Sequence, residues 1–196
     1  KFLLNNYAIL SNVVILIAIL SGIFTFKKYR GTPVIFFTKI LCYILLVSFL
    51  GGYSSCYKEL EFLQPLYDSY FRKNYWWFTL FFDIGAVLLI ALFFQKIVKQ
   101  KSHKKIIKYI RGIFFVFSGL YILSRGTDLF IQSLPVIQIA SALVIIISTT
   151  LYFIEVMQSD NILHFYKSVY FYISIALFVW FIVISPISFF DVYNRN

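Results

Sequence analysis

The stretch Trp76–Phe94 reads WWFTLFFDIGAVLLIALFF and carries a single ionisable side chain, that of Asp83. From Ala86 to Phe94 every residue is apolar, so no face of this segment suits contact with water. A lipid-facing barrel strand would instead alternate apolar and polar residues in segments of about ten. A membrane-spanning helix needs about 20 mostly apolar residues. The stretch therefore predicts a transmembrane helix, and the run Ala142–Ile147 (ALVIII) predicts another.

The composition of the whole chain agrees with this prediction. Of its 196 residues, 61% are hydrophobic, against roughly 45–50% in an ordinary soluble domain. Aromatic residues make up 21% of the chain and charged residues only 13%. Such a chain lacks the polar groups needed to cover a soluble fold. Composition therefore excludes a soluble globular enzyme, a disordered protein and a disulfide-stapled secreted domain.

Six stretches are long and apolar enough for membrane helices, which predicts an all-α, polytopic transmembrane bundle formed by residues 1–196 as a single domain. The predicted spans are about 7–26, 32–50, 76–94, 106–123, 135–157 and 170–190. Pro33 and Pro135 each suit the first turn of a helix, and Gly51-Gly52 suits a helix stop. Pro186 is expected to kink the last helix or end it early.

The basic residues between these spans predict the orientation. Segment 27–31 carries three bases and no acid, and segment 95–108 carries six bases and no acid. The positive-inside rule places both segments in the cytoplasm, so that segments 53–75 and 124–134 face outward. Tyr75, Trp76 and Trp77 then lie at the outer interface, where such rings are enriched. The prediction is a multi-pass protein of a bacterial inner (cytoplasmic) membrane.

The net charge of +10 would suggest a nucleic-acid partner in a soluble protein. Here the bases lie between spans, so the expected partner is the lipid bilayer and not nucleic acid. The lysines either bind anionic lipid headgroups, at about 1 kcal/mol per base, or only determine topology. The candidate headgroup-binding residues are Lys96, Lys99, Lys101, Lys104, Lys105 and Lys108.

Asp83 and Lys39 need an explanation, because ionisable groups inside hydrocarbon are costly. Asp83 lies seven residues past Trp76, or about 10 Å along a helix. It is either a proton, cation or ligand site, or a carboxyl that holds helices together by hydrogen bonds. Lys39 either pairs with Asp83 or extends its side chain to the nearer interface.

A second polar stretch follows the predicted fourth span. Arg125 and Asp128 share a face if the helix continues, whereas Gly126 favours a break. The alternative to a ligand site here is a capping salt bridge that contributes little. The candidate polar pocket for a small ligand or ion comprises Asp83, Arg125, Asp128, Gln132 and Gln138, with Ser141 beside them.

Nothing in the chain predicts a catalytic residue, a cofactor or a metal site. His103 and His164 have no Cys or His at ligand spacing, and neither lies well inside the bundle, as a haem ligand would. No nucleotide-binding or hydrolase motif is present. Glu155 is expected near the cytoplasmic face, within reach of the lysine-rich segment, where it predicts a charge-paired rim.

Residues Tyr152–Pro186 read YFIEVMQSDNILHFYKSVYFYISIALFVWFIVISP. Glu155 at a helix end, the turn 159–163 and the helix start 167–173 resemble the last part of small, mostly uncharacterised multi-helix membrane proteins of Bacteroidota. Such bundles are similar to the membrane domains of sensor kinases. The resemblance implies an integral membrane protein of six or seven spans with a sensor-like role.

The predicted function is that of a non-enzymatic, sensor-like or scaffolding subunit of a membrane complex. It would act through helix packing with other membrane-protein subunits or with further copies of itself. Dense aromatic faces and few intramembrane charges favour binding lipid or protein over moving ions. The alternative is a small transporter or channel whose polar site is formed by Asp83, Arg125 and Asp128.

Overall fold

The computed structural model describes residues 7–55, 64–158, 165 and 167–194. Within these ranges the chain forms helices and turns and no strand, as the sequence predicts. Four helices are long and apolar enough to cross a membrane, namely Pro33–Ser54, Tyr75–Ile97, Lys101–Arg125 and Pro135–Met157. Two further apolar helices, Ile9–Phe24 and Val169–Val183, are shorter. A membrane-spanning length is thus confirmed for four of the six predicted spans.

The element order starts with a helical pair and ends with a long helix that passes through Pro186. The elements are α2 (Tyr7–Phe24), α3 (Pro33–Gly51), η1 (Gly52–Ser55), α4 (Gln64–Tyr67), η3 (Tyr70–Arg72), α5 (Tyr75–Trp77), η4 (Phe78–Ala86), α6 (Val87–Ile97), α7 (Lys101–Arg125), α8 (Asp128–Ile131), α9 (Pro135–Met157) and α10 (Val169–Asn194). Pro33 and Pro135 stand in first turns, as predicted, and α3 ends at Gly51. Pro186 does not end its helix, because α10 continues to Asn194.

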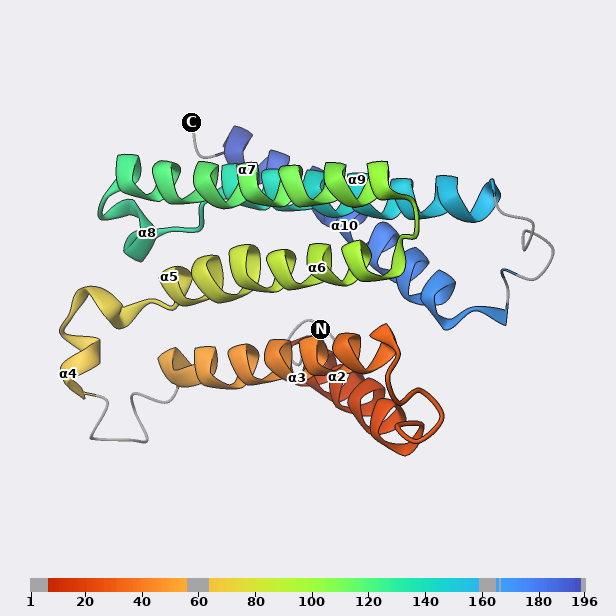
Figure 1. The fold of residues 1–196 in the computed structure, drawn as a ribbon. Helices are drawn as coiled ribbons and strands as arrows, with labels where there is room; N and C mark the ends of the chain where they lie inside the picture. The colour runs from red at the N-terminus through yellow and green to blue at the C-terminus, as the bar shows by residue number, and fades with distance from the viewer. Residues whose placement is uncertain (1–6, 56–63, 159–164, 166, 195–196) are drawn as a thin grey trace.

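The segments α5, η4 and α6 join into one helix, Tyr75–Ile97, which we call the central helix. It lies between α3 on one side and the pair α7 and α9 on the other (Figure 1). Helix α2 packs on α3, and α10 packs on α9. The buried core is built mainly from apolar side chains of the central helix, α7 and α9. Its members include Val87, Ile90, Ala91, Phe93, Phe94, Ile107, Phe114, Ile137 and Ile145.

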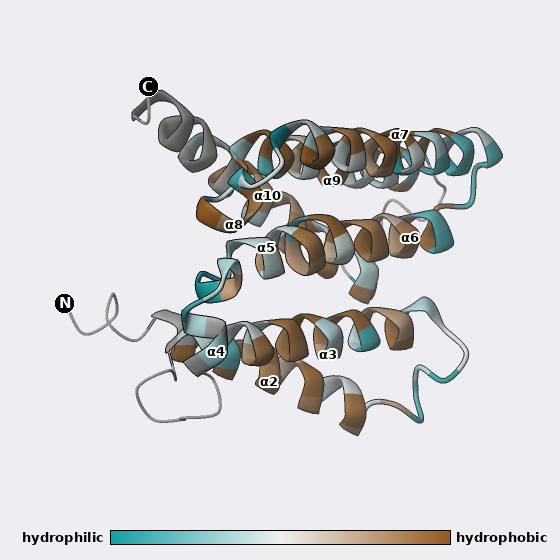
Figure 2. Ribbon diagram, turned by 90° about the vertical axis from the view of Figure 1, so that its left-hand side faces the viewer, coloured by the Kyte–Doolittle hydropathy of each residue, from teal (hydrophilic) through white to brown (hydrophobic). Residues whose placement is uncertain are grey.

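The two ends of the bundle differ in chemistry. Turns 25–32 and 98–100 lie at one end, which we call the basic end (Figure 1). Elements α4, α5 and α8 lie at the opposite end, where the rings of Phe71, Trp76 and Phe130 pack together with centroids 5.2–6.5 Å apart. We call this the aromatic end. Figure 2 shows hydrophobic residues along the helices and hydrophilic residues gathered toward both ends.

The lysine-rich segment 95–108 is not a loop, which corrects the sequence prediction. Only residues 98–100 lie outside helices, since α6 ends at Ile97 and α7 begins at Lys101. Lysine is a good helix former, and its long aliphatic stem allows a helix to continue past the hydrocarbon with the ammonium in water. The span predicted from residue 106 is therefore the apolar part of a longer helix.

Helices α2 and α3 approach closely at two contacts between polar or small residues. The Ser48 hydroxyl donates a hydrogen bond to Asn12 Oδ1 at 2.8 Å. Gly22 faces Thr38 so closely that a methyl group on Gly22 would lie 2.6 Å from Thr38 Oγ1. Small residues that allow close backbone approach are typical of helix pairs in membranes.

We expect Gly22→Ala to lower the free energy of unfolding by about 1–3 kcal/mol, as overpacking does elsewhere. The methyl group meets Thr38, so α2 must move away from α3. Thermal unfolding in detergent measures the change. The matched control is Gly119→Ala, because no atom of another segment lies within 4 Å of the added methyl group there. Adding Thr38→Ala should recover stability, and a Gly22→Ala variant as stable as the parent would contradict this packing.

Candidate functional site

Asp83 lies in η4, a nine-residue π-helical segment within the central helix. Long π-helical stretches are rare, and shorter ones occur frequently at functional sites. Hydroxyl groups from both neighbouring helices bond to the backbone of this segment. The Tyr43 hydroxyl, on α3, donates to the Phe81 carbonyl oxygen at 2.8 Å. The Ser141 hydroxyl, on α9, donates to the Asp83 carbonyl oxygen at 2.7 Å. The π-helical segment is thus held from two sides.

The Asp83 side chain points to α9, where Gln138 Nε2 lies 3.5 Å from its Oδ2 atom. The Ser141 hydroxyl also lies 2.8 Å from the Ile137 carbonyl oxygen of its own helix. We call Tyr43, Asp83, Gln138 and Ser141 the polar centre. The structure thus brings Asp83 together with Gln138, as the sequence prediction of a pocket requires. Whether this centre binds a ligand stays a prediction.

Lys39 does not neutralise Asp83. Its side chain is exposed, and among the described residues it forms no ion pair with Asp83. The structure therefore gives no support for a pair with Asp83, and extension of the Lys39 ammonium to an interface stays a prediction. A partly buried carboxyl therefore lies mid-helix with amide and hydroxyl neighbours and, within the described ranges, without a basic ion-pair partner.

Gly85 makes the close approach of Tyr43 possible. A Cβ atom at this position would collide with the Tyr43 hydroxyl oxygen and would lie 3.3 Å from the Leu80 carbonyl oxygen. The absence of a side chain therefore gives Tyr43 access to the Phe81 carbonyl group. The sequence analysis did not identify Tyr43, and the only local signal was a glycine two residues after an intramembrane aspartate.

Arg125 and Asp128 lie at the aromatic end, away from the polar centre. Phe130 of α8 packs against Trp76, which is seven residues or about 10 Å before Asp83 on the central helix. Gly126 breaks α7 with a φ of +53°, yet the Arg125 and Asp128 side chains still approach to 4.0 Å. Arg125 is exposed and Asp128 is partly exposed.

Gln132 follows α8 at the aromatic end. Its side chain is exposed, and its backbone N–H donates to the Asp128 carbonyl oxygen at 3.0 Å. The five residues predicted to form one pocket are thus distributed over two places. Asp83 and Gln138 belong to the polar centre, whereas Arg125, Asp128 and Gln132 belong to the surface of the aromatic end. Ligand binding by the second group also stays a prediction.

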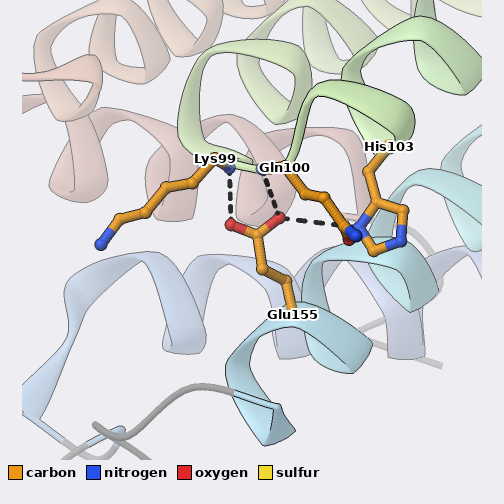
Figure 3. A network of polar contacts seen from close by, with 4 residues as sticks. All are labelled: Lys99, Gln100, His103 and Glu155. Atoms are coloured by element: carbon orange, nitrogen blue, oxygen red, sulfur yellow. Dashed lines mark hydrogen bonds and ion pairs between the residues drawn. The ribbon is translucent and has the colours of Figure 1, made fainter.

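Glu155 binds the turn between α6 and α7 at the basic end (Figure 3). Its carboxylate accepts hydrogen bonds from the backbone N–H groups of Lys99 at 2.6 Å and Gln100 at 3.2 Å. The His103 Nδ1 atom lies 3.6 Å from the same carboxylate. A negative charge at a helix start is favourable, because the first amides of a helix carry partial positive charge. Glu155 therefore caps α7, where the sequence predicted a pairing with lysine ammonium groups.

The lysines of this end follow one face of α7. Lys101, Lys104, Lys105 and Lys108 are spaced at i, i+3, i+4 and i+7, which places them on one side of a helix. Lys96 instead lies 5.0 Å from the centre of the Phe36 ring, and Lys99 is exposed in the turn. This arrangement suits contact with anionic headgroups, which stays a prediction.

Within the described ranges, no cluster of three or more His, Cys, Asp or Glu side chains could hold a metal ion. His164, Asp160 and most of the turn 159–163 that carries the resemblance lie outside the described residues. Comparison with family models, curated proteins and solved structures found no match for this chain. The positions of its polar groups are therefore the basis for any functional proposal.

We expect Gly85→Ala to lower stability by about 1–3 kcal/mol, because the new methyl group displaces the Tyr43 hydroxyl from the Phe81 carbonyl. Thermal unfolding in detergent measures the loss. The double variant Gly85→Ala/Tyr43→Phe should be less destabilised than the sum of the two single changes, since the collision is gone. Strict additivity of the two effects would show that Gly85 and Tyr43 do not interact.

Glu155→Gln should destabilise the bundle by about 1–2 kcal/mol, because two backbone N–H groups lose a charged acceptor. Asp128→Asn provides the comparison, since it removes an exposed ion pair with a 4.0 Å separation. Such pairs contribute under about 1 kcal/mol. The measurement is again thermal unfolding of both variants in the same detergent. Equal losses would contradict the capping role of Glu155.

Proposed function

We propose that this chain is a non-enzymatic, sensor-like subunit of a membrane complex, and that the polar centre is its responsive element. The nine-residue π-helical segment in the central helix is the observation that carries the proposal. A one-residue change of helical register moves the flanking helix by about 1.5 Å and rotates it by about 100°. The bonds from Tyr43 and Ser141 favour one register. A ligand or partner that competes for them would favour another.

The central helix suits this role, because it runs from the aromatic end to the basic end and contacts α3, α7 and α9. A register change at Asp83 would shift Trp76 and its aromatic neighbours relative to the capped turn at Glu155. Discrete rearrangements of packed helices are a known way in which proteins carry a signal between sites.

The proposed setting is a bacterial inner membrane crossed by six helices. Segments 27–31 and 95–108 would face the cytoplasm, with the lysines of α7 at the depth of anionic headgroups. Support comes from their common position at the basic end (Figure 1). Large apolar side chains on the outside, such as Phe49, Ile113 and Leu123, would contact lipid, partner subunits or a second copy of the chain.

A small transporter or channel is the second candidate. The observation in its favour is Asp83, a partly buried carboxyl in the middle of a span without a described basic partner. Intramembrane carboxyls commonly mark ion and proton pathways. This alternative would use Asp83 as a binding group, with Arg125 and Asp128 near the entrance at the aromatic end.

We expect wild-type protein in proteoliposomes to show no proton, Na⁺ or K⁺ flux above empty liposomes. Gentle-detergent purification from the native membrane should instead recover a stoichiometric membrane partner. Ser141→Ala should reduce the recovered partner by about two- to tenfold, the effect of losing one hydrogen bond that favours the native register. Quantitative mass spectrometry and ion-flux assays are the measurements.

Ser148→Ala is the matched control for Ser141→Ala. Both serines are buried on α9, but the Ser148 hydroxyl bonds only to the Val144 carbonyl of its own helix. Its substitution should leave partner recovery unchanged. A flux that Asp83→Asn abolishes in folded protein would replace the sensor proposal with the transporter alternative.

A further inference from the structure

A hollow of about 350 Å³ lies at the aromatic end and was not anticipated from the sequence. It is formed where the end of η1, the segments α4 and η3, and the start of the central helix meet. The described side chains that line it include two bases and no acid. The lining residues are Ser54, Tyr67, Arg72, Lys73, Asn74 and Tyr75.

Both bases are held in place by aromatic and polar neighbours. The Arg72 guanidinium lies 4.2 Å from the centre of the Tyr67 ring, and its Nη2 atom donates to the Tyr67 hydroxyl at 2.8 Å. The Lys73 ammonium lies 5.6 Å from the Tyr75 ring centre and donates to the Ile131 carbonyl oxygen at 3.3 Å. Cations that are already positioned lose less conformational entropy when they bind an anion.

The walls of the hollow are tied to the end of α3. The Tyr53 hydroxyl donates to the Phe71 carbonyl oxygen at 2.7 Å and accepts a hydrogen bond from Trp76 Nε1 at 3.0 Å. Asn74 Nδ2 donates to the Gly51 carbonyl oxygen at 2.8 Å. The short segments on either side of the bases are therefore fixed by bonds that do not involve the two cations.

We propose that this hollow binds a phosphate group through Arg72 and Lys73. An arginine fork matches the geometry of phosphate oxygens, and a lysine ammonium adds a compact charge. Hydroxyls of Tyr75 and Ser54 offer further hydrogen bonds to a glycerol or sugar moiety attached to the phosphate. A volume of about 350 Å³ is at the small end of ligand pockets, which hold about 300–1,000 Å³.

The surroundings of Lys73 support an anionic ligand. No described carboxylate forms an ion pair with Lys73. Asp68, the described acid of this segment, is exposed and is not among the lining residues. The Lys73 ammonium has three N–H donors, and one of them bonds to the Ile131 carbonyl oxygen. The other donors can bond to an anion.

The position of the hollow next to two tryptophans allows two sources for the phosphate. Trp76 and Trp77 follow the lining residues directly, and tryptophan rings are enriched at the level of lipid headgroups. A phospholipid headgroup and a water-soluble phosphate ester or free phosphate both carry the required chemistry. The site would therefore lie at the membrane surface, independent of the polar centre around Asp83.

Binding to the purified full chain in detergent tests the proposal. Tryptophan fluorescence is followed during titration with inorganic phosphate and, separately, with dihexanoyl phosphatidylglycerol. Dihexanoylglycerol, which lacks the phosphate, is the lipid control. We expect Arg72→Gln and Lys73→Gln each to weaken binding about tenfold or more, the loss that a charge-assisted hydrogen bond implies. Lys73→Arg should retain binding.

Lys28→Gln is the matched control variant. The Lys28 ammonium lies 5.5 Å from the Tyr29 ring centre, much as Lys73 does from Tyr75, but it is not a lining residue of the hollow. This variant should bind as the parent does. Circular dichroism and the unfolding midpoint of the Arg72 and Lys73 variants are compared with those of the parent, so that binding is measured on folded protein.

The two probes distinguish the sources. Binding of both probes supports a phosphate site open to lipid and solute, binding of the lipid alone supports a headgroup site, and binding of inorganic phosphate alone supports a soluble ligand. The proposal is overturned if neither probe binds, if dihexanoylglycerol binds as tightly as the phospholipid, or if the folded Arg72→Gln/Lys73→Gln double variant binds as the parent does.

Discussion

The structure depends on the satisfaction of backbone hydrogen bonds in the middle of the central helix. Hydrocarbon offers no hydrogen-bond partners, so each peptide group must find one within the protein. The π-helical segment departs from the ordinary helical pattern, and two hydroxyls from neighbouring helices bond to its carbonyl groups. Because Tyr43 belongs to α3 and Ser141 to α9, these bonds also connect the two sides of the bundle. The π-helical segment and the packing of α3 and α9 on the central helix therefore depend on the same two hydrogen bonds.

Glycine and serine make this arrangement possible because of their size. Gly85 leaves space for the Tyr43 hydroxyl, and Gly51 lets α3 approach the rings of Trp77 and Phe78. Around these contacts the core is filled by larger apolar side chains of the central helix, α7 and α9. Membrane helices gain little from burying apolar groups against each other, so close approach and specific hydrogen bonds determine which faces meet.

The two ends of the bundle place positive charge in different chemical environments. At the basic end, lysines follow one face of α7. Their ammonium groups repel the partial positive charge at the start of this helix, and the Glu155 carboxylate offsets that repulsion. At the aromatic end, Arg72 and Lys73 lie against tyrosine rings beside a hollow. The first arrangement suits a broad anionic surface, whereas the second suits a discrete anionic group.

The amino-acid sequence by itself determined the helical, membrane-embedded class, since runs such as Ala86–Phe94 leave no polar face. It also identified Asp83 and Gln138, because a polar group in a hydrophobic run stands out without any knowledge of its neighbours. Only the tertiary structure decided that Asp83 meets Gln138 and Ser141 while Arg125 and Asp128 stay at the surface. It alone revealed the π-helical segment, the capping role of Glu155 and the hollow beside Arg72. Hydropathy depends on single residues, whereas these features depend on which helix faces meet, and that is set by contacts between residues distant in the chain.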